Sequence, residues 1–277
     1  MSTVPKLEPQ WVPEYQIIKE VGRGGYGRVY LAIKDNEPYA IKVIKVHKDE
    51  DIILREIIIL HYLSQPKCRL NILCFIDAKK VEPKNIYILI TKYMSGGELG
   101  DYIYNTYYSY MEHNRKLYYK VLYKYFYQMA DAVNEIHKLG IAHNDIKPSN
   151  FLVNNDKVYL SDFGLACPLT EELAKKLNIK MCSILGGTKQ FMAPQLYKNK
   201  VKDFKKVDIY ALGVTYYYLL YFEFPFYDNN LDVGLMELDP FLDKRVKVLI
   251  YEMLNSNPDE RPTTKEILET FHSLINT

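Results

Sequence analysis

The chain has 277 residues, 48% of them hydrophobic, and a formal net charge of +2 at pH 7. This length and apolar content suffice for a large core and exclude extensive disorder. The small net charge gives no reason to expect nucleic acid or an anionic membrane as a partner, and no apolar run approaches the roughly 18 residues of a membrane span. No signal-peptide pattern opens the chain, so we expect an intracellular, cytoplasmic protein, with the nucleus as the alternative compartment.

Residues 1–14 contain three prolines and few signals of regular structure, which predicts an arm that packs on, or trails from, the structure that follows. A glycine-rich segment, VGRGGYGRV at 21–29, then lies between strand-like runs at 15–18 and 29–33. A Rossmann fold would start a helix after the third glycine, whereas a strand follows here, so the pattern favours a hairpin. Glycine backbones can approach phosphates closely because they have no Cβ. The candidate phosphate contacts are Gly22, Gly24, Gly25 and Gly27.

An alternating strand pattern ends at Lys42, and a helical apolar pattern follows over 51–60. Glu56 lies within that apolar face, one turn before Leu60, and is therefore the predicted ion-pair partner of Lys42, in preference to Glu50. The plain alternatives are a solvated lysine at a strand end and a surface glutamate on a helix.

Tyrosine is unusually frequent, with 26 residues, and many of them fall within 102–127. The pattern from 102 to 139 predicts two helices. Stacking of nucleic-acid bases on these rings is one interpretation. No basic track is interleaved with them, so we predict core packing with the hydroxyls at the surface.

The most informative pattern is HNDIKPSN at 143–150, followed by SDFG at 161–164. Phosphoryl transfer needs positioning and positive charge, because its loose transition state spreads negative charge over the phosphate oxygens. Asp145 is suited to accept the proton of an incoming hydroxyl, and Lys147 can reach the transferred phosphate as a mobile charge. Asn150 and Asp162 offer hard oxygen ligands for Mg²⁺, with Mn²⁺ as the alternative ion.

In this order and spacing, the glycine hairpin, the YAIK strand end at 39–42 and the HxD and DFG motifs resemble the eukaryotic-type protein kinases. The resemblance covers about 15–271. It implies an α+β, two-lobed fold, with a small β-rich N-lobe that carries one main helix and a larger, mostly helical C-lobe. The expected division of a single kinase domain over 1–277 is an N-terminal arm at 1–14, an N-lobe at 15–91, a hinge at 92–98 and a C-lobe at 99–277.

The resemblance assigns Lys42 to the α- and β-phosphates of ATP and Thr91 to the gatekeeper position before the hinge. Backbone groups of Lys92 to Met94 would bind adenine, and Glu98 would approach the ribose or the peptide. The residues matching the family's apolar sandwich around adenine are Val29, Ala40 and Leu152. Generic core packing is compatible with that role.

The segment GTKQFMAPQ at 187–195 resembles the family's GTxxFMAPE motif. Together with Lys147 it favours serine/threonine over tyrosine kinases, and Thr188 would orient Asp145 and Lys147. Gln195 replaces the glutamate that pairs, in the family, with a buried arginine, which matches Arg261 here.

Asp208 matches the family's DxxxxG motif at a helix start, and it would brace the backbone of the catalytic loop. Asn144 replaces the common arginine before the catalytic aspartate, which meets a phosphorylated residue in regulated kinases. We therefore expect activity without phosphorylation, although Thr170 and Ser183 remain candidate sites.

The four cysteines have no CxxC spacing, so no zinc site is indicated, and without a secretory signal we expect reduced thiols. Cys167 and Cys182 lie between the SDFG and GTKQFMAPQ motifs, in the counterpart of the family's activation segment, where a redox role stays open.

The resemblance thus implies a protein serine/threonine kinase that transfers the γ-phosphate of ATP to protein substrates with Mg²⁺. One alternative is a pseudokinase scaffold that binds ATP and partners without efficient catalysis, left open by Asn144 and Gln195. Another is a kinase for a small molecule or lipid, which the GTxxFMAP resemblance disfavours.

Overall fold

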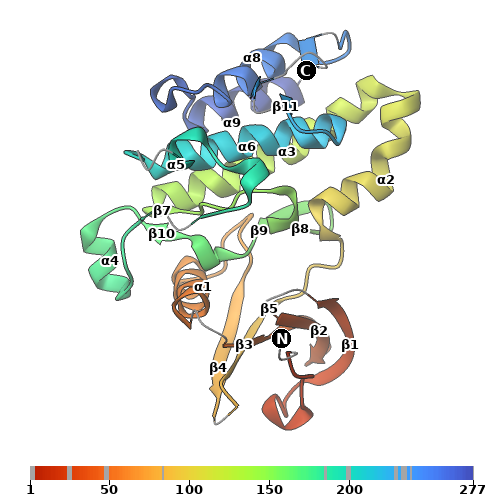
Figure 1. The fold of residues 1–277 in the computed structure, drawn as a ribbon. Helices are drawn as coiled ribbons and strands as arrows, with labels where there is room; N and C mark the ends of the chain where they lie inside the picture. Colours follow the sequence, from red (N-terminus) through yellow and green to blue (C-terminus); the bar gives the residue numbers. More distant parts are fainter. Residues whose placement is uncertain are drawn as a thin grey trace.

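The computed structural model describes residues 4–23, 27–46, 50–82, 84–183, 186–197, 201–227, 230–231, 236–237 and 239–276. Its N-terminal part is an antiparallel sheet of five strands in the order β1-β2-β3-β5-β4, accompanied by one long helix (Figure 1). These elements are β1 (Gln16–Arg23), β2 (Gly27–Lys34), β3 (Glu37–Lys45), α1 (Glu50–Leu63), β4 (Phe75–Val81) and β5 (Ile86–Lys92).

The two faces of this sheet pack against different partners. In β5, Tyr87 and Leu89 belong to the main core, whereas the alternate residues Ile86, Ile88 and Ile90 belong to a second core. That second core includes Leu7, Trp11 and Val12 of the N-terminal segment, which are all buried. The predicted arm therefore packs on the outer face of the sheet.

The rest of the chain is mostly helical (Figure 1). Its helices are α2 (Leu99–His113), α3 (Arg115–Lys138), α4 (Glu171–Leu177), α5 (Pro194–Tyr197), α6 (Phe204–Tyr221), α8 (Lys244–Met253) and α9 (Thr264–Ile275). Helix α3 contacts both α6 and α9. A five-stranded antiparallel sheet with one helix, followed by a helical region, confirms the expected α+β fold class.

The tyrosine-rich stretch forms α2 and α3, as predicted, and several of its rings lie in the core. Tyr118 and Tyr119 are almost fully buried. Tyr118 Oη donates to the Leu219 carbonyl at 2.6 Å, and Phe126 stacks on Tyr216 with ring centroids 4.2 Å apart. Buried tyrosines thus satisfy their hydroxyls within the helical core, which differs from the expected placement of the hydroxyls at the surface.

The C-terminal part also contains short strands. They are β6 (Gly97–Glu98), β7 (Ile141–Ala142), β8 (Phe151–Asn154), β9 (Lys157–Leu160), β10 (Cys167–Pro168), β11 (Phe226–Tyr227) and β12 (Asn230–Leu231). The sheet β6-β8-β9 and the pair β10-β7 lie between the five-stranded sheet and the helices (Figure 1). The loops after β7 and β9 carry the HND and DFG motifs, so both motifs project from rigid strands.

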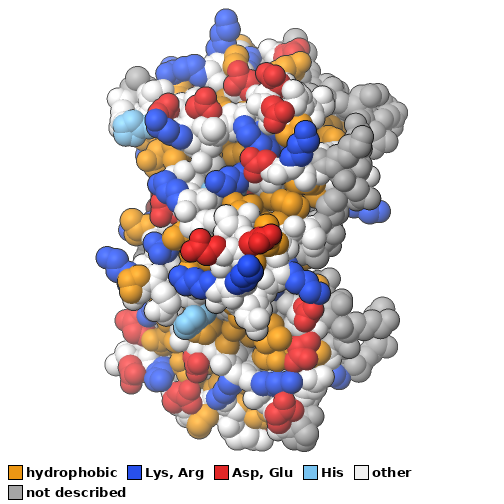
Figure 2. Space-filling model, turned by 90° about the vertical axis from the view of Figure 1, so that its left-hand side faces the viewer, with side chains coloured by type: hydrophobic (Ala, Val, Ile, Leu, Met, Phe, Trp, Pro, Cys, Tyr) orange, Lys and Arg blue, Asp and Glu red, His pale blue; other side chains and the backbone are white. Residues whose placement is uncertain are grey.

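No helix in the described part of the chain is long and apolar enough to span a membrane. On the face that carries α4 (Figure 2), basic and acidic side chains are interspersed among the residues that the structure describes. This mixture creates no broad field of one sign on that face.

Candidate active site

Lys42 on β3 and Glu56 on α1 form a close ion pair. Lys42 Nζ lies 2.8 Å from Glu56 Oε1 and 2.9 Å from Oε2. Glu50, the rejected alternative, instead accepts from Tyr87 Oη at 2.6 Å and from Lys80 Nζ at 3.0 Å. Burial acts to lower the pKa of Lys42, but the charges of Glu56 and Asp162 outweigh it and raise that pKa. Lys42 is therefore held as a fixed cation facing Asp162.

Asp145 is the centre of a hydrogen-bond network in the loop after β7. Its Oδ2 accepts from Lys147 Nζ at 2.7 Å and from Asn150 Nδ2 at 3.1 Å. Its Oδ1 accepts from the Thr188 amide at 3.0 Å and from Thr188 Oγ1 at 2.8 Å. Burial alone would raise the pKa of Asp145, but Lys147 and Thr188 together lower it. The carboxylate is therefore ionised and fixed in orientation.

Thr188 reaches this loop because the residue before it, Gly187, can pack closely against the loop backbone. Gly187 has φ +146°, and a Cβ there would lie 3.2 Å from the Asn144 carbonyl oxygen. Lys147 Nζ also donates to Thr188 Oγ1 at 2.8 Å. The sequence-predicted trio of Asp145, Lys147 and Thr188 is thus brought together.

The backbone of this loop is held by Asp208 of α6, which is fully buried. Asp208 accepts from the His143 and Asn144 amides, each at 2.8 Å, and contacts His137 Nε2 at 2.8 Å. Asn144 has φ +64°, a conformation that asparagine tolerates better than most residues. The predicted bracing contact of Asp208 is present, whereas its contact with His137, a histidine on a mostly apolar helix face, was not predicted.

The candidate metal ligands are Asn150, which belongs to the Asp145 network, and Asp162. Asn150 donates Nδ2 to the Asp145 carbonyl at 2.8 Å, which leaves its side-chain oxygen as the ligand atom. Asp162 follows β9 with φ +60°. No group of three or more His, Cys, Asp or Glu suited to a metal occurs among the described residues. One amide and one carboxylate nevertheless fit Mg²⁺, which retains waters and uses substrate phosphates as its other ligands.

The candidate nucleotide-binding residues occupy one face of the sheet. Val29 lies opposite Lys42, and Ala40 lies opposite Thr91, so all four side chains share a face. The candidates Val29, Ala40 and Leu152 keep partial exposure, unlike fully buried core residues such as Ile41 and Val43. Thr91 is buried.

The glycine-rich segment is a β1–β2 hairpin, as predicted, with Gly22 paired to Val29. A Cβ at Gly27 would lie 2.7 Å from the Val43 carbonyl oxygen, so close contact with β3 requires glycine there. Gly24 and Gly25 lie outside the described residues. At the other side of the face, the Lys92 amide donates to the Cys74 carbonyl at 3.1 Å, while Met94 is buried.

A groove of about 620 Å³ opens next to Lys147 and Thr188. Glu98 and Asp101, at the start of α2, line its acidic side, and Phe222 and Phe224 line an aromatic side. Of these four residues only Glu98 was predicted, because Phe222 and Phe224 become its neighbours through long-range packing and Asp101 matches none of the motifs.

Gln195 and Arg261 form the predicted buried contact. Arg261 Nη2 donates to Gln195 Oε1 at 3.0 Å, while Gln195 Nε2 is buried without a partner in the described structure. Burial lowers the pKa of Arg261 to about 10, and its guanidinium lies 4.8 Å from the centroid of the Tyr210 ring. The contact therefore lacks the compensating charge that a carboxylate would supply.

We expect Gln195→Glu to stabilise the protein. The change removes a buried donor without an acceptor and adds a charge-assisted bond, together worth about 1–2 kcal/mol. Thermal unfolding should show a melting temperature higher by about 2–6 °C. Gln190→Glu makes the same chemical change at an exposed position and should leave it unaltered. A lower melting temperature for Gln195→Glu would contradict this prediction.

The expectation of reduced thiols is wrong for this structure. Cys68 is bonded to Cys74, and Cys167 is bonded to Cys182, so no described cysteine is free. The second pair is 15 residues apart, but the chain returns through α4 and brings the two Cα atoms to 4.9 Å. Sequence spacing alone does not reveal this approach.

Comparison with known proteins links this geometry to one family. Residues 15–272 match the family model described as the protein kinase domain. CBL-interacting serine/threonine-protein kinase 12 of Arabidopsis thaliana is 32% identical over 270 residues, which cover 92% of this chain and 51% of that protein. CBL-interacting protein kinase 10 of Oryza sativa subsp. japonica is 30% identical over 271 residues, covering 92% of this chain and 56% of that protein. The chain spans about half the length of these curated relatives.

Proposed function

The chain belongs to the protein kinase domain family, and we propose that it is a serine/threonine kinase that transfers the γ-phosphate of ATP to protein hydroxyls. One observation carries the proposal: Lys147 and Thr188 both hold the Asp145 carboxylate, next to an open groove. This arrangement suits a base that orients a peptide hydroxyl beside a phosphate-binding cation.

In the proposed reaction, Asp145 accepts the proton of the substrate hydroxyl while Lys147 neutralises charge on the transferred phosphate. Lys42, fixed by Glu56, binds the α- and β-phosphates. Asn150 and Asp162 would hold Mg²⁺, which neutralises the phosphate oxygens. The groove beside Glu98 and Asp101 would receive the peptide.

ATP would bind on the sheet face that carries Lys42. Val29, Ala40 and Leu152 would enclose adenine, and Thr91 would limit the depth of the pocket. The Lys92 amide is engaged with Cys74, so the Met94 amide becomes the preferred donor to adenine. The glycine hairpin, including Gly22, Gly24, Gly25 and Gly27, would cover the phosphates.

The proposal divides the domain into an N-lobe at 15–91, a hinge at 92–98 and a C-lobe at 99–277. Serine/threonine specificity is supported by the Lys147–Thr188 contact at 2.8 Å and by the similarity to the Arabidopsis thaliana serine/threonine-protein kinase. The substitutions Asn144 and Gln195 keep a pseudokinase scaffold as the second candidate.

The test is Mg²⁺-dependent transfer of labelled γ-phosphate from ATP to a mixed protein substrate, followed by phosphoamino-acid analysis. Label on serine and threonine that is absent with Asp145→Asn supports the proposal. ATP binding without transfer to any protein substrate would replace it with the pseudokinase, and label on tyrosine alone would overturn the specificity.

We further expect activity without phosphorylation. The Asn144 amide group contacts the Leu165 carbonyl and the Cys167 sulfur, and it has no cationic group with which to bind a phosphate. Thr170 caps α4 by accepting from the Leu173 amide at 3.3 Å, so its hydroxyl already has a structural role. Phosphatase treatment, checked by mass spectrometry, should change the transfer rate by less than about twofold, whereas loss of activity would contradict this expectation.

A further inference from the structure

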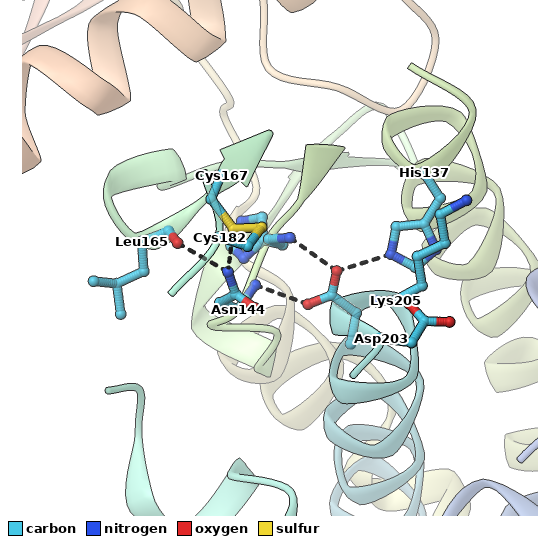
Figure 3. Close-up of a disulfide and its surroundings, with 9 residues drawn as sticks. His137, Asn144, Leu165, Cys167, Cys182, Asp203 and Lys205 are labelled. Atoms are coloured by element: carbon cyan, nitrogen blue, oxygen red, sulfur yellow. Dashed lines mark hydrogen bonds and ion pairs between the residues drawn. A yellow bond between two sulfur atoms is a disulfide. The ribbon is translucent and has the colours of Figure 1, made fainter. Parts of the chain in front are cut away.

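The Cys167–Cys182 bond closes a loop within the activation segment, the residues between the DFG motif and Gln195 (Figure 3). Cys167 is fully buried in β10 and pairs with Ala142 of β7, directly before the HND motif. Cys182 follows α4 and is partly exposed, and its amide donates to the Pro168 carbonyl at 3.2 Å. The bond therefore fixes the returning end of the loop to the strand that adjoins the catalytic loop.

Asn144 connects this disulfide to the catalytic loop. Its Nδ2 lies 3.1 Å from the Leu165 carbonyl oxygen and 2.9 Å from Cys167 Sγ (Figure 3). The Leu165 carbonyl oxygen can only accept, so the NH₂ group of the Asn144 side chain must be the group on this side, and it therefore also donates to Cys167 Sγ. The backbone amide of Asn144 is bonded to Asp208, and the next residue is Asp145. The Asn144 side chain thus connects the disulfide to the residue directly before the proposed base, Asp145.

The closed loop also contacts the helix that carries Glu56. Lys176 Nζ of α4 lies 5.6 Å from the centroid of the Tyr62 ring on α1. A cavity between the two helices is lined by Ile58 and Tyr62 of α1 and by Lys176 and Leu177 of α4. A shift of α4 would therefore alter the contact between Lys176 and Tyr62 of α1.

We propose that Cys167 and Cys182 form a thiol–disulfide modification site whose oxidised form holds the activation segment and supports catalysis. The regulatory part rests on the proposed kinase function. The bond covalently ties the returning end of the segment to Cys167, whose sulfur accepts a hydrogen bond from Asn144 of the catalytic loop, where a charged contact is missing. Reduction removes that link and lowers the transfer rate.

The chemistry is thiol–disulfide exchange with a low-molecular-weight thiol of the glutathione class. Its thiolate attacks the more accessible Cys182 Sγ, the S–S bond breaks, and Cys167 leaves as a thiolate that accepts the Asn144 N–H. A second thiolate attacks the mixed disulfide at the glutathione sulfur, which releases the Cys182 thiolate and glutathione disulfide. Two electrons have passed to the cysteines, each of which takes up a proton, and glutathione disulfide reverses the sequence.

The experiment equilibrates the full chain in glutathione buffers of increasing reduced-to-oxidised ratio. Differential alkylation with mass spectrometry reports each cysteine, backbone hydrogen exchange reports residues 168–182, and labelled phosphate transfer reports activity. The variants are Cys182→Ser, which alters only the partly exposed partner, and Cys167→Ser/Cys182→Ser. Cys68→Ser/Cys74→Ser is the matched control, because it removes the other disulfide.

Reduction of the Cys167–Cys182 pair should speed exchange of residues 168–182 by about tenfold and lower transfer by at least about fivefold. Cys182→Ser should match the reduced protein in every buffer, and the matched control should keep the full response. Equal exchange and equal transfer in the two states, or a redox response that persists in Cys182→Ser, would overturn the proposal. Absence of transfer in all states would refute the kinase function and the regulation, while alkylation and exchange would still decide whether the pair is a modification site.

Discussion

Asp145→Asn should reduce phosphate transfer by about 10²–10⁴-fold, while ATP binding and the fold are retained. The carboxylate accepts hydrogen bonds on both oxygens, from Thr188 on one and from Lys147 and Asn150 on the other. An amide keeps one acceptor but presents its NH₂ group either to Thr188 or to the Lys147 ammonium. It also has no basic oxygen for the substrate proton.

Single-turnover transfer, ATP affinity and melting temperature of Asp145→Asn should be measured together. Asp259→Asn makes the same change of charge at an exposed position and is the matched control. If Asp145→Asn kept more than about a tenth of the transfer rate, Asp145 would not be the base. A joint loss of ATP binding and stability would instead indicate a structural role.

The pH dependence gives a second check on Asp145. Burial acts to raise its pKa, but Lys147 and Thr188 lower it below the ordinary value of 3.8. A base with a depressed pKa stays ionised as the pH falls. Protonation of Asp145 should therefore reduce the transfer rate only below pH 3.8. A fall in the transfer rate near neutral pH that is absent from Asp145→Asn would contradict the assignment of Asp145 as a base with a lowered pKa.

Local patterns were enough to predict the parts of the site that depend on strand and helix periodicity. The alternating pattern that ends at Lys42 predicted the strand β3, and the helical pattern of α1 chose Glu56 over Glu50. The reason that Glu50 is not the partner is long-range: it accepts from Tyr87, on a strand more than 30 residues away. The sequence pattern predicted the Lys42–Glu56 contact but gave no sign of the Glu50–Tyr87 contact.

Contacts between segments that are distant in the sequence were harder to predict. The return of Cys182 to Cys167 depends on α4, which is followed by its C-cap residue Asn178 with φ +53°. That left-handed residue reverses the chain, and asparagine in such a place is common enough to carry no specific signal. Similarly, His137 meets Asp208 only when α3 and α6 pack together. The motif-based prediction therefore named residues that the structure brings together around Asp145, and missed what ties the activation segment to them.

Asp208→Asn is the substitution for which we expect the largest loss of stability. Asp208 is fully buried, and its two oxygens accept from the His143 and Asn144 amides and contact His137. An amide side chain can satisfy these donors with only one oxygen, so its NH₂ group must face at least one backbone N–H. Leaving buried donors without acceptors should cost about 2–4 kcal/mol, which lowers the melting temperature by roughly 5–15 °C.

Asp203→Asn is the matched control for this prediction, because it makes the same change on the same helix. Asp203 caps α6 by accepting from the Lys205 amide at 2.8 Å, and asparagine caps a helix about as well, so the change should stay within about 0.5 kcal/mol (Figure 3). Asp208→Asn should also lower phosphate transfer at temperatures where the protein remains folded, since the amides it holds directly precede Asp145. A stable variant with reduced transfer would show that Asp208 positions the loop without stabilising the fold, whereas unchanged stability and transfer would refute the bracing role.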